Sequence, residues 1–129
     1  AISYATLGKT SNKDLFAGDA VLGVNGQPYS SGALATIGNW LYFAGLNHAY
    51  NRSLPNGIDH TADFYIPVGR IYVEFWPTDA DAAELSNKLA AKALYEAHGL
   101  AMIEIVPDDI AKLDDVMPRE LLRHGVTVY

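Results

Sequence analysis

The segment from His60 to Trp76 constrains the fold of this chain most, because its pattern predicts two strands joined by a tight turn. Before the turn, apolar residues alternate with polar ones around Asp63, which is the period-2 pattern of a half-buried strand. After the turn the alternation resumes, and Glu74 lies in an otherwise apolar and aromatic run. If the chain turns symmetrically about Val68-Gly69, residues 66, 65 and 63 lie opposite residues 71, 72 and 74.

Asp63 and Glu74 are therefore predicted to be direct cross-strand neighbours on one face of a sheet. Like charges that face each other in an antiparallel pair cost about 0.2–1 kcal/mol, and more where water solvates them poorly. Such a pair is useful to a protein when a cation or a proton lies between the carboxylates. We take the pair as the candidate functional site; the alternative is that both acids face solvent at an uncovered sheet edge.

One helix is predicted before this hairpin. Ser30 or Ser31 can cap its N-terminus, the run from Gly32 to Ala44 has helical spacing, and Gly45 is a natural stop. A short extended segment from His48 to about Leu54 then leads toward the hairpin.

Another helix, a strand and a final helix are predicted after the hairpin. The helix covers residues 80–97 with Thr78 or Asp79 as its cap, and its predicted core-facing side carries apolar residues at helical spacing: Ala82, Leu85, Leu89 and Ala93. The mostly apolar run 100–106 is typical of a buried strand. The last helix begins at Pro107 and is predicted to be interrupted near Pro118.

These elements predict a single α/β domain, in which a mixed central sheet is flanked by helices in the order α-β-β-β-α-β-α. A chain of 129 residues can bury one core but not two. Residues 30–129 make up this core, and residues 1–29 form a small N-terminal β arm or hairpin. Asn25-Gly26 favours a type I′ turn there, and residues 4–7 are a further short strand candidate. The arm either covers an edge of the main sheet or pairs with a second copy.

The charge balance limits the partners of this protein. Lys and Arg number 9 against 15 Asp and Glu, a net charge of −6, which argues against a strong non-specific DNA binder. The absence of cysteine excludes disulfides and thiolate metal sites. We find no run long enough to span a membrane and no secretory leader, so we expect a cytoplasmic protein without membrane contact.

The string ADFYIP…IYVEFW, with two lysines and LYEAHGLAMIEI after it, resembles the PD-(D/E)xK nuclease superfamily, whose fold is restriction-endonuclease-like. The resemblance covers roughly residues 31–125. It is closest to a branch in which the lysine is missing two positions after the second acid, here Trp76, and is supplied by the following helix. It implies that Lys88 or Lys92 is the catalytic lysine.

The resemblance also implies a metal site made by Asp63, Glu74 and the backbone carbonyl of Phe75. The expected metal is Mg²⁺, with Mn²⁺ as a substitute, because hard oxygen ligands select such ions. A divalent cation polarises a phosphoryl oxygen and activates water, and a lysine stabilises the charge that develops on phosphate. The implied activity is phosphodiester hydrolysis of nucleic acid, with DNA as the expected substrate. A homodimer is left open, because many enzymes of this fold act as dimers.

Some residues depart from the family pattern or have simpler interpretations. Leu34 or a neighbour stands where many members carry a glutamate on the first helix, so the second hypothesis is a nuclease fold that no longer cuts and serves as a binding or assembly module. Lys88 could instead pair with Glu84 on a solvated helix face, worth about 0.2–0.5 kcal/mol. His60 is a weaker candidate for a residue that supports the acids.

Overall fold

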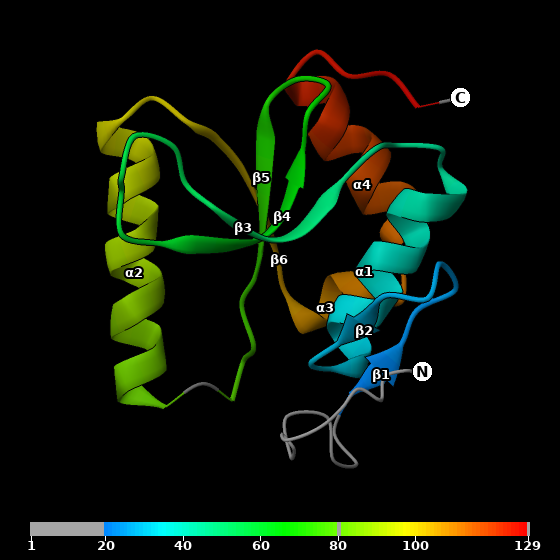
Figure 1. Ribbon diagram of the computed structural model, residues 1–129, viewed down its shortest axis with the longest axis horizontal. Helices are drawn as coiled ribbons and strands as arrows, with labels where there is room; N and C mark the ends of the chain where they lie inside the picture. Colours follow the sequence, from blue (N-terminus) through cyan, green and yellow to red (C-terminus); the bar gives the residue numbers. More distant parts are fainter. Residues whose placement is uncertain (1–19, 80, 129) are drawn as a thin grey trace.

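The computed structural model describes residues 20–79 and 81–128, and the predicted strand at residues 4–7 lies outside them. A central sheet separates one long helix from the remaining helices (Figure 1). In chain order the elements are β1 (Val21–Leu22), β2 (Pro28–Tyr29), α1 (Gly32–Phe43), β3 (Ala49–Ser53), β4 (Thr61–Ile66), β5 (Ile71–Phe75), α2 (Ala82–Ala97), β6 (Ala101–Ile105), α3 (Pro107–Ile110) and α4 (Leu113–Arg123). None of these helices has the length and apolar character that a membrane crossing requires.

The main sheet has four strands in the order β3-β4-β5-β6. The pairs β3–β4 and β4–β5 are antiparallel, whereas β6 runs parallel to β5 after the crossover through α2. The β4–β5 register is the predicted one, with Tyr65 opposite Tyr72 and Ile66 opposite Ile71. Gly69 and Arg70 have positive φ angles of 83° and 53°, which closes the tight turn. The predicted mixed sheet flanked by helices is therefore confirmed.

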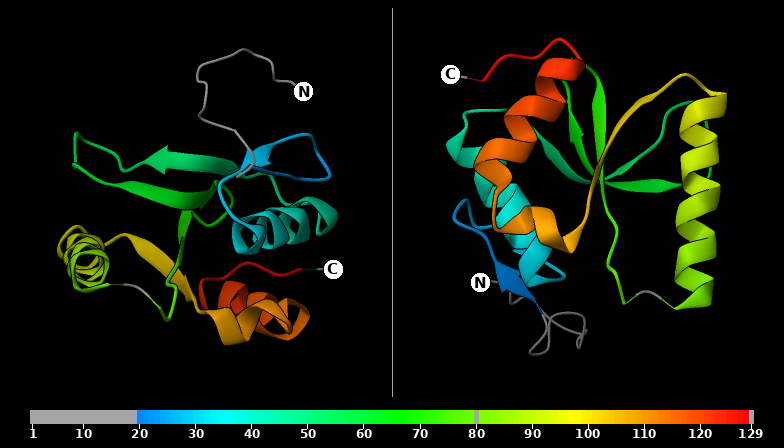
Figure 2. Two further views of the ribbon diagram at one scale, coloured as in Figure 1. Left: turned by 90° about the horizontal axis from the view of Figure 1, so that it is seen from below. Right: turned by 180° about the vertical axis from the view of Figure 1, so that it is seen from behind.

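The two faces of the sheet are covered unequally (Figure 2). The face toward α1 and α4 carries the larger core, which includes Phe64, Ile66 and Val73. The face toward α2 carries a smaller cluster built from Leu54, Ala62, Tyr72, Ala91 and Tyr95. Residues of β4 alternate between buried and partly exposed positions, so Asp63 falls between buried neighbours rather than in the larger core.

The helix α1 begins and ends as its sequence predicts. The Ser31 side chain accepts a hydrogen bond from the backbone N–H of Leu34 at 3.2 Å, so Ser31 rather than Ser30 is the cap. The helix ends before Gly45, whose φ of 74° suits glycine. The hairpin β1–β2 packs against this helix, and Tyr29 inserts its ring between α1 and Tyr50 of the edge strand β3.

The described part of the N-terminal arm thus forms a hairpin without extending the main sheet. Its turn was predicted as type I′, which needs positive φ at both central residues. Only Gly26 has a positive φ in this loop. The Gly23 carbonyl accepts a hydrogen bond from the Gly26 N–H, and the Gly23 N–H donates to the Gln27 carbonyl. Residues 21–29 thus form a hairpin, but its turn is not the predicted type I′.

Two predictions about α2 are also wrong. Its cap is Asp81, not Thr78 or Asp79, and Asp81 forms a reciprocal capping box with Glu84. The predicted core-facing side is exposed, with Leu85 47% and Leu89 54% accessible, as are Ala82 and Ala93. The helix instead turns Ala91 and Tyr95 toward the sheet, and Lys88 is partly buried beside them.

Electrostatics explain this orientation of α2. Burying a leucine fully stabilises a fold by about 1.5–3 kcal/mol, so two half-exposed leucines forfeit only part of that amount each. An uncompensated buried carboxylate costs several kcal/mol. Glu74 is buried on the face that α2 covers, and a helix that presents Lys88 to it avoids the larger penalty.

The C-terminal helical segment breaks at Ala111–Lys112, not near Pro118 as predicted. Pro118 lies inside α4, although it lacks the N–H that would reach the carbonyl four residues earlier. Val116, Met117 and Leu121 are buried in the larger core, and this packing holds α4 together through the proline.

Candidate active site on the β4–β5 hairpin

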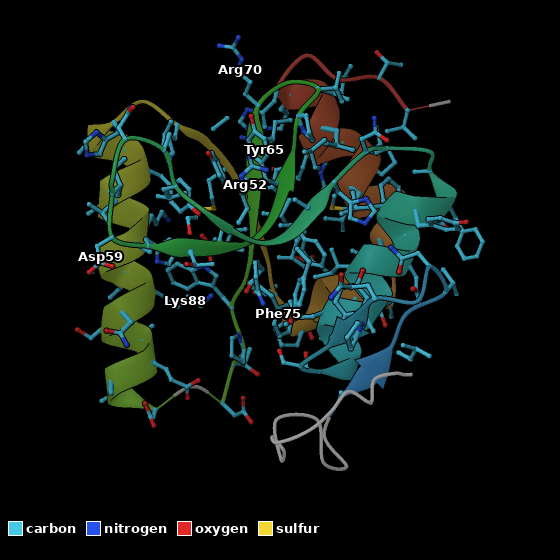
Figure 3. All side chains as sticks on the ribbon, viewed as in Figure 1. Arg52, Asp59, Tyr65, Arg70, Phe75 and Lys88 are labelled. Carbon is cyan, nitrogen blue, oxygen red and sulfur yellow. The ribbon has the colours of Figure 1, made fainter. Side chains whose placement is uncertain are left out.

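Adjacent strands and one helix bring a lysine to the two predicted acids. The Lys88 ammonium lies 2.9 Å from Oε1 of Glu74 and 3.7 Å from Oδ2 of Asp63. Lys88 reaches the sheet from α2, as Figure 3 shows. The β4–β5 register places residue 63 opposite residue 74 one pair beyond the last pair of the ladder, Phe64 and Val73. The carboxylates therefore lie on the α2 side of the sheet and share one cation.

Glu74 is the only buried charged side chain among the described residues, at 1% exposure. Three donors converge on its carboxylate. Lys88 donates to Oε1, while the Tyr95 hydroxyl at 2.6 Å and His60 Nε2 at 2.5 Å contact Oε2. His60 Nε2 acts as the donor in this pair, since an ionised carboxylate only accepts. Both oxygens of the buried group thus accept hydrogen bonds, as burial of a carboxylate requires.

Asp63 is less buried, with 21% of its side chain exposed. Its Oδ2 accepts a 2.7 Å hydrogen bond from the backbone N–H of Phe75. Desolvation raises the pKa of the Asp63 carboxyl, and the negative charge of Glu74 adds to this effect. The Lys88 ammonium and the Phe75 hydrogen bond oppose it without cancelling it. The site therefore holds an acid whose ionisation is costly in the absence of a further cation.

The structure separates the two candidate lysines. The Lys92 ammonium lies 3.5 Å from Oε1 of Glu104 on β6, and 6.0 Å from the centre of the Trp76 ring. It contacts neither Asp63 nor Glu74. Lys88 alone of the two lies at the acid pair, and Lys92 neutralises a different carboxylate.

Phe75 lies at the site through its backbone. Its N–H donates a hydrogen bond to Asp63, and Phe75 also lines the cleft beside the acids. The role of its carbonyl as a metal ligand stays a prediction.

An open cleft of about 340 Å³ gives solvent access to Asp63 and Lys88. It is lined by residues from four parts of the fold: Ser30, Ser31, Leu34, Asp63, Phe75, Pro77, Glu84 and Lys88. This volume is within the range of ligand-binding clefts, so a substrate group can reach Asp63 and Lys88. Leu34 supplies an apolar wall at the position where a first-helix glutamate was expected.

The sequence interpretation missed Tyr95 and Glu84 as neighbours of the site. Both lie in one stripe of α2 with Lys88, at steps of four and seven residues. If Lys88 neutralises the acids, it must face the sheet, and Tyr95 of the same stripe then faces the sheet as well. His60, the candidate for a residue that supports the acids, contacts Glu74.

The possible metal ligands at the site can be compared with the coordination that a divalent cation requires. No group of three His, Asp or Glu side chains is arranged to hold a metal within residues 20–79 and 81–128. Two carboxylates are nevertheless sufficient for Mg²⁺, which keeps several water ligands. The Lys88 ammonium already occupies a cation position between Asp63 and Glu74. The three groups sum to −1, so the residues present fit a divalent ion that takes over this position.

The chain matches no protein-family model, no curated protein and no solved structure. The function must therefore be inferred from the chemistry of the site itself.

Proposed function

We propose that this protein is a metal-dependent nuclease that hydrolyses phosphodiester bonds of nucleic acid, with DNA as the expected substrate. The observation that carries the proposal is the cation position between Asp63 and Glu74, which Lys88 occupies at the wall of an open cleft. Paired carboxylates with an adjacent lysine are the groups that such hydrolysis requires.

The proposal includes a restriction-endonuclease-like fold. It is supported by the antiparallel strands β3, β4 and β5, which are followed by α2 and a parallel β6. The acids lie on the central hairpin and the lysine on the helix that crosses over to β6. This order places all three groups on one face of the sheet.

Each residue has a separate role in the proposed reaction. Asp63 and Glu74 would hold Mg²⁺ or Mn²⁺, and the bound metal would polarise the phosphoryl oxygen and lower the pKa of a water. Lys88 donates hydrogen bonds to carboxylates in this structure. With a metal held by the acids, the Lys88 ammonium would be available to orient the attacking water and to stabilise negative charge on the phosphate. Glu74 is held in position by its buried hydrogen bonds.

The two lysines of α2 provide a matched test. Purified wild type, Lys88→Gln and Lys92→Gln would be incubated with single-stranded, duplex and branched DNA, with Mg²⁺ or Mn²⁺ and with EDTA. We expect Lys88→Gln to lower the cleavage rate about 10²–10³-fold, the usual effect of removing one stabilising donor. Lys92→Gln should stay within about twofold of wild type, because Lys92 contacts Glu104 instead of the acid pair.

An Asp63→Asn variant controls for contaminating nucleases, since it removes one acid and keeps an acceptor for the Phe75 N–H. Equal cleavage by wild type and Asp63→Asn would remove the catalytic claim. Equal losses in both lysine variants would contradict the assignment of Lys88.

The second candidate function is a nuclease-fold module that binds nucleic acid or protein and cuts weakly or not at all. It is favoured by the net charge of −6 and by Leu34, which lines the cleft where an acid was expected. Fewer acids bind a divalent cation more weakly. Binding of DNA in a gel-shift assay without cleavage at any Mg²⁺ or Mn²⁺ concentration would support this function over the first.

A further inference from the structure

Glu74 presents its two oxygens to different surroundings. Oε1 faces Lys88 and the shared cation position, whereas Oε2 is held by Tyr95 and His60. We propose that Tyr95 and His60 are positioning residues that fix the Glu74 carboxylate so that Oε1 alone is presented to the cation. The inference rests on the proposed nuclease function, and it assigns to that site two residues beyond the acids and the lysine.

The energetic reason lies in the burial of Glu74. A buried acceptor without a partner costs about 1–3 kcal/mol, so Oε2 cannot stay unpaired at a site where Glu74 is 1% exposed. Without Tyr95 and His60, the carboxylate would lower this cost by turning both oxygens toward Lys88. The ammonium would then be bound more tightly by Glu74 and would be harder for a metal to displace.

The fold prepares both donors for this role. Tyr95 follows Lys88 by seven residues on α2, so one helix face supplies the cation and the positioning hydroxyl. Tyr95 is 2% exposed. Its hydroxyl donates a 2.6 Å hydrogen bond to Oε2 of Glu74, so the donor is held in place by burial as well as by its position on the helix.

His60 is held by a second contact besides Glu74. Its ring packs edge-on against Tyr95, with ring centres 5.9 Å apart at an angle of 85°. The imidazole comes from the loop before β4, and Tyr95 comes from α2. The two donors thus approach Oε2 from two elements and restrict rotation of the carboxylate.

Tyr95→Phe tests the hydroxyl, and Tyr72→Phe is its matched control. Tyr72 belongs to the same cluster, with its ring centre 5.7 Å from that of Tyr95, but it is not a hydrogen-bond partner of Glu74. Mn²⁺ affinity would be measured by calorimetry and by electron paramagnetic resonance, beside the Mn²⁺ concentration for half-maximal cleavage. We expect Tyr95→Phe to weaken Mn²⁺ binding about 10–100-fold, the usual effect of losing a group that orients a ligand. Tyr72→Phe should change it less than twofold.

His60 is tested by loss and rescue. His60→Leu removes the donor and should weaken Mn²⁺ binding, whereas His60→Gln retains an N–H at a similar position and should restore most of the affinity. A melting curve for each variant checks that the fold is intact.

The outcomes distinguish this inference from the proposed function. If wild type neither binds Mn²⁺ nor cleaves DNA, both are overturned. If wild type binds and cleaves but Tyr95→Phe and His60→Leu match its Mn²⁺ affinity, the positioning roles are overturned and the nuclease proposal stands. Equal losses in Tyr95→Phe and Tyr72→Phe would also overturn the positioning roles, because the effect would then come from packing.

Discussion

Asp63 is held in a position where its negative charge is costly. Desolvation raises the pKa of its carboxyl above the ordinary 3.8, and Glu74 adds to the effect. A raised folded-state pKa means that the folded protein holds the proton more tightly than the unfolded chain does. Ionisation of Asp63 therefore lowers the free energy of unfolding as pH rises from 3.8 through the raised value. Above that value the loss is complete.

Asp63→Asn should consequently stabilise the protein at neutral pH. The asparagine oxygen can still accept the Phe75 N–H, while the desolvated charge is gone. We expect its melting temperature to exceed that of wild type at pH 7, and the difference to shrink toward zero as pH falls toward 3.8. Thermal melts between pH 4 and 8 without divalent metal would measure this difference. A difference that is constant across this range, or largest at low pH, would contradict the argument.

At the scale of elements, the β4–β5 hairpin was predictable and the orientation of α2 was not. Alternation and the turn residues determine the register of a hairpin locally, so Tyr65 and Tyr72 could be paired from sequence. Hydrophobic periodicity assigned Leu85 and Leu89 to the core side of α2, because it takes no account of a charge elsewhere that requires a partner. The deciding residue was Glu74, whose buried carboxylate finds its partner Lys88 only when the sheet and the helix are assembled.

Sequence patterns are local and do not show contacts between distant segments, which explains why some site residues were missed. Asp63 and Glu74 could be found because both lie in one continuous hairpin. Tyr95 comes from α2, outside the hairpin segment, and it converges with His60 on Glu74 only in three dimensions. Lys88 and Lys92 were equivalent in sequence, and the position of Glu104 on β6 separates them.

The orientation of α2 can be tested by stability measurements. Leu85→Gln and Leu89→Gln should each change the free energy of unfolding by less than about 0.5 kcal/mol, as is usual for surface positions. Ala91→Leu adds volume at a buried position and should cost about 1–3 kcal/mol. Urea denaturation of the three variants would measure these changes. A loss of several kcal/mol for either glutamine variant would mean that its leucine is buried after all.

Over the whole molecule, the proposed function requires an acidic protein to attract an anionic substrate to a cleft whose lining includes the carboxylates of Asp63 and Glu84. The net charge is −6, and the group of Asp63, Glu74 and Lys88 carries −1 before metal binds. Under the proposed function, a divalent cation would change the charge of this group to +1, and the group would then attract a phosphate instead of repelling it. Metal binding should therefore precede substrate binding, and it should also relieve the repulsion between the acids.

This relief should be measurable as stabilisation by Mn²⁺. A ligand that binds only the folded state stabilises it by about 2.7 kcal/mol at 100 times its dissociation constant, which raises the melting temperature of a domain this size by several degrees. Melts of wild type with and without millimolar Mn²⁺ would measure the shift, and Asp63→Asn should abolish most of it. Lys92→Gln should retain the full shift, because Lys92 neutralises Glu104. The absence of a shift in wild type, or an equal shift in Asp63→Asn, would mean that the carboxylate pair does not bind the metal.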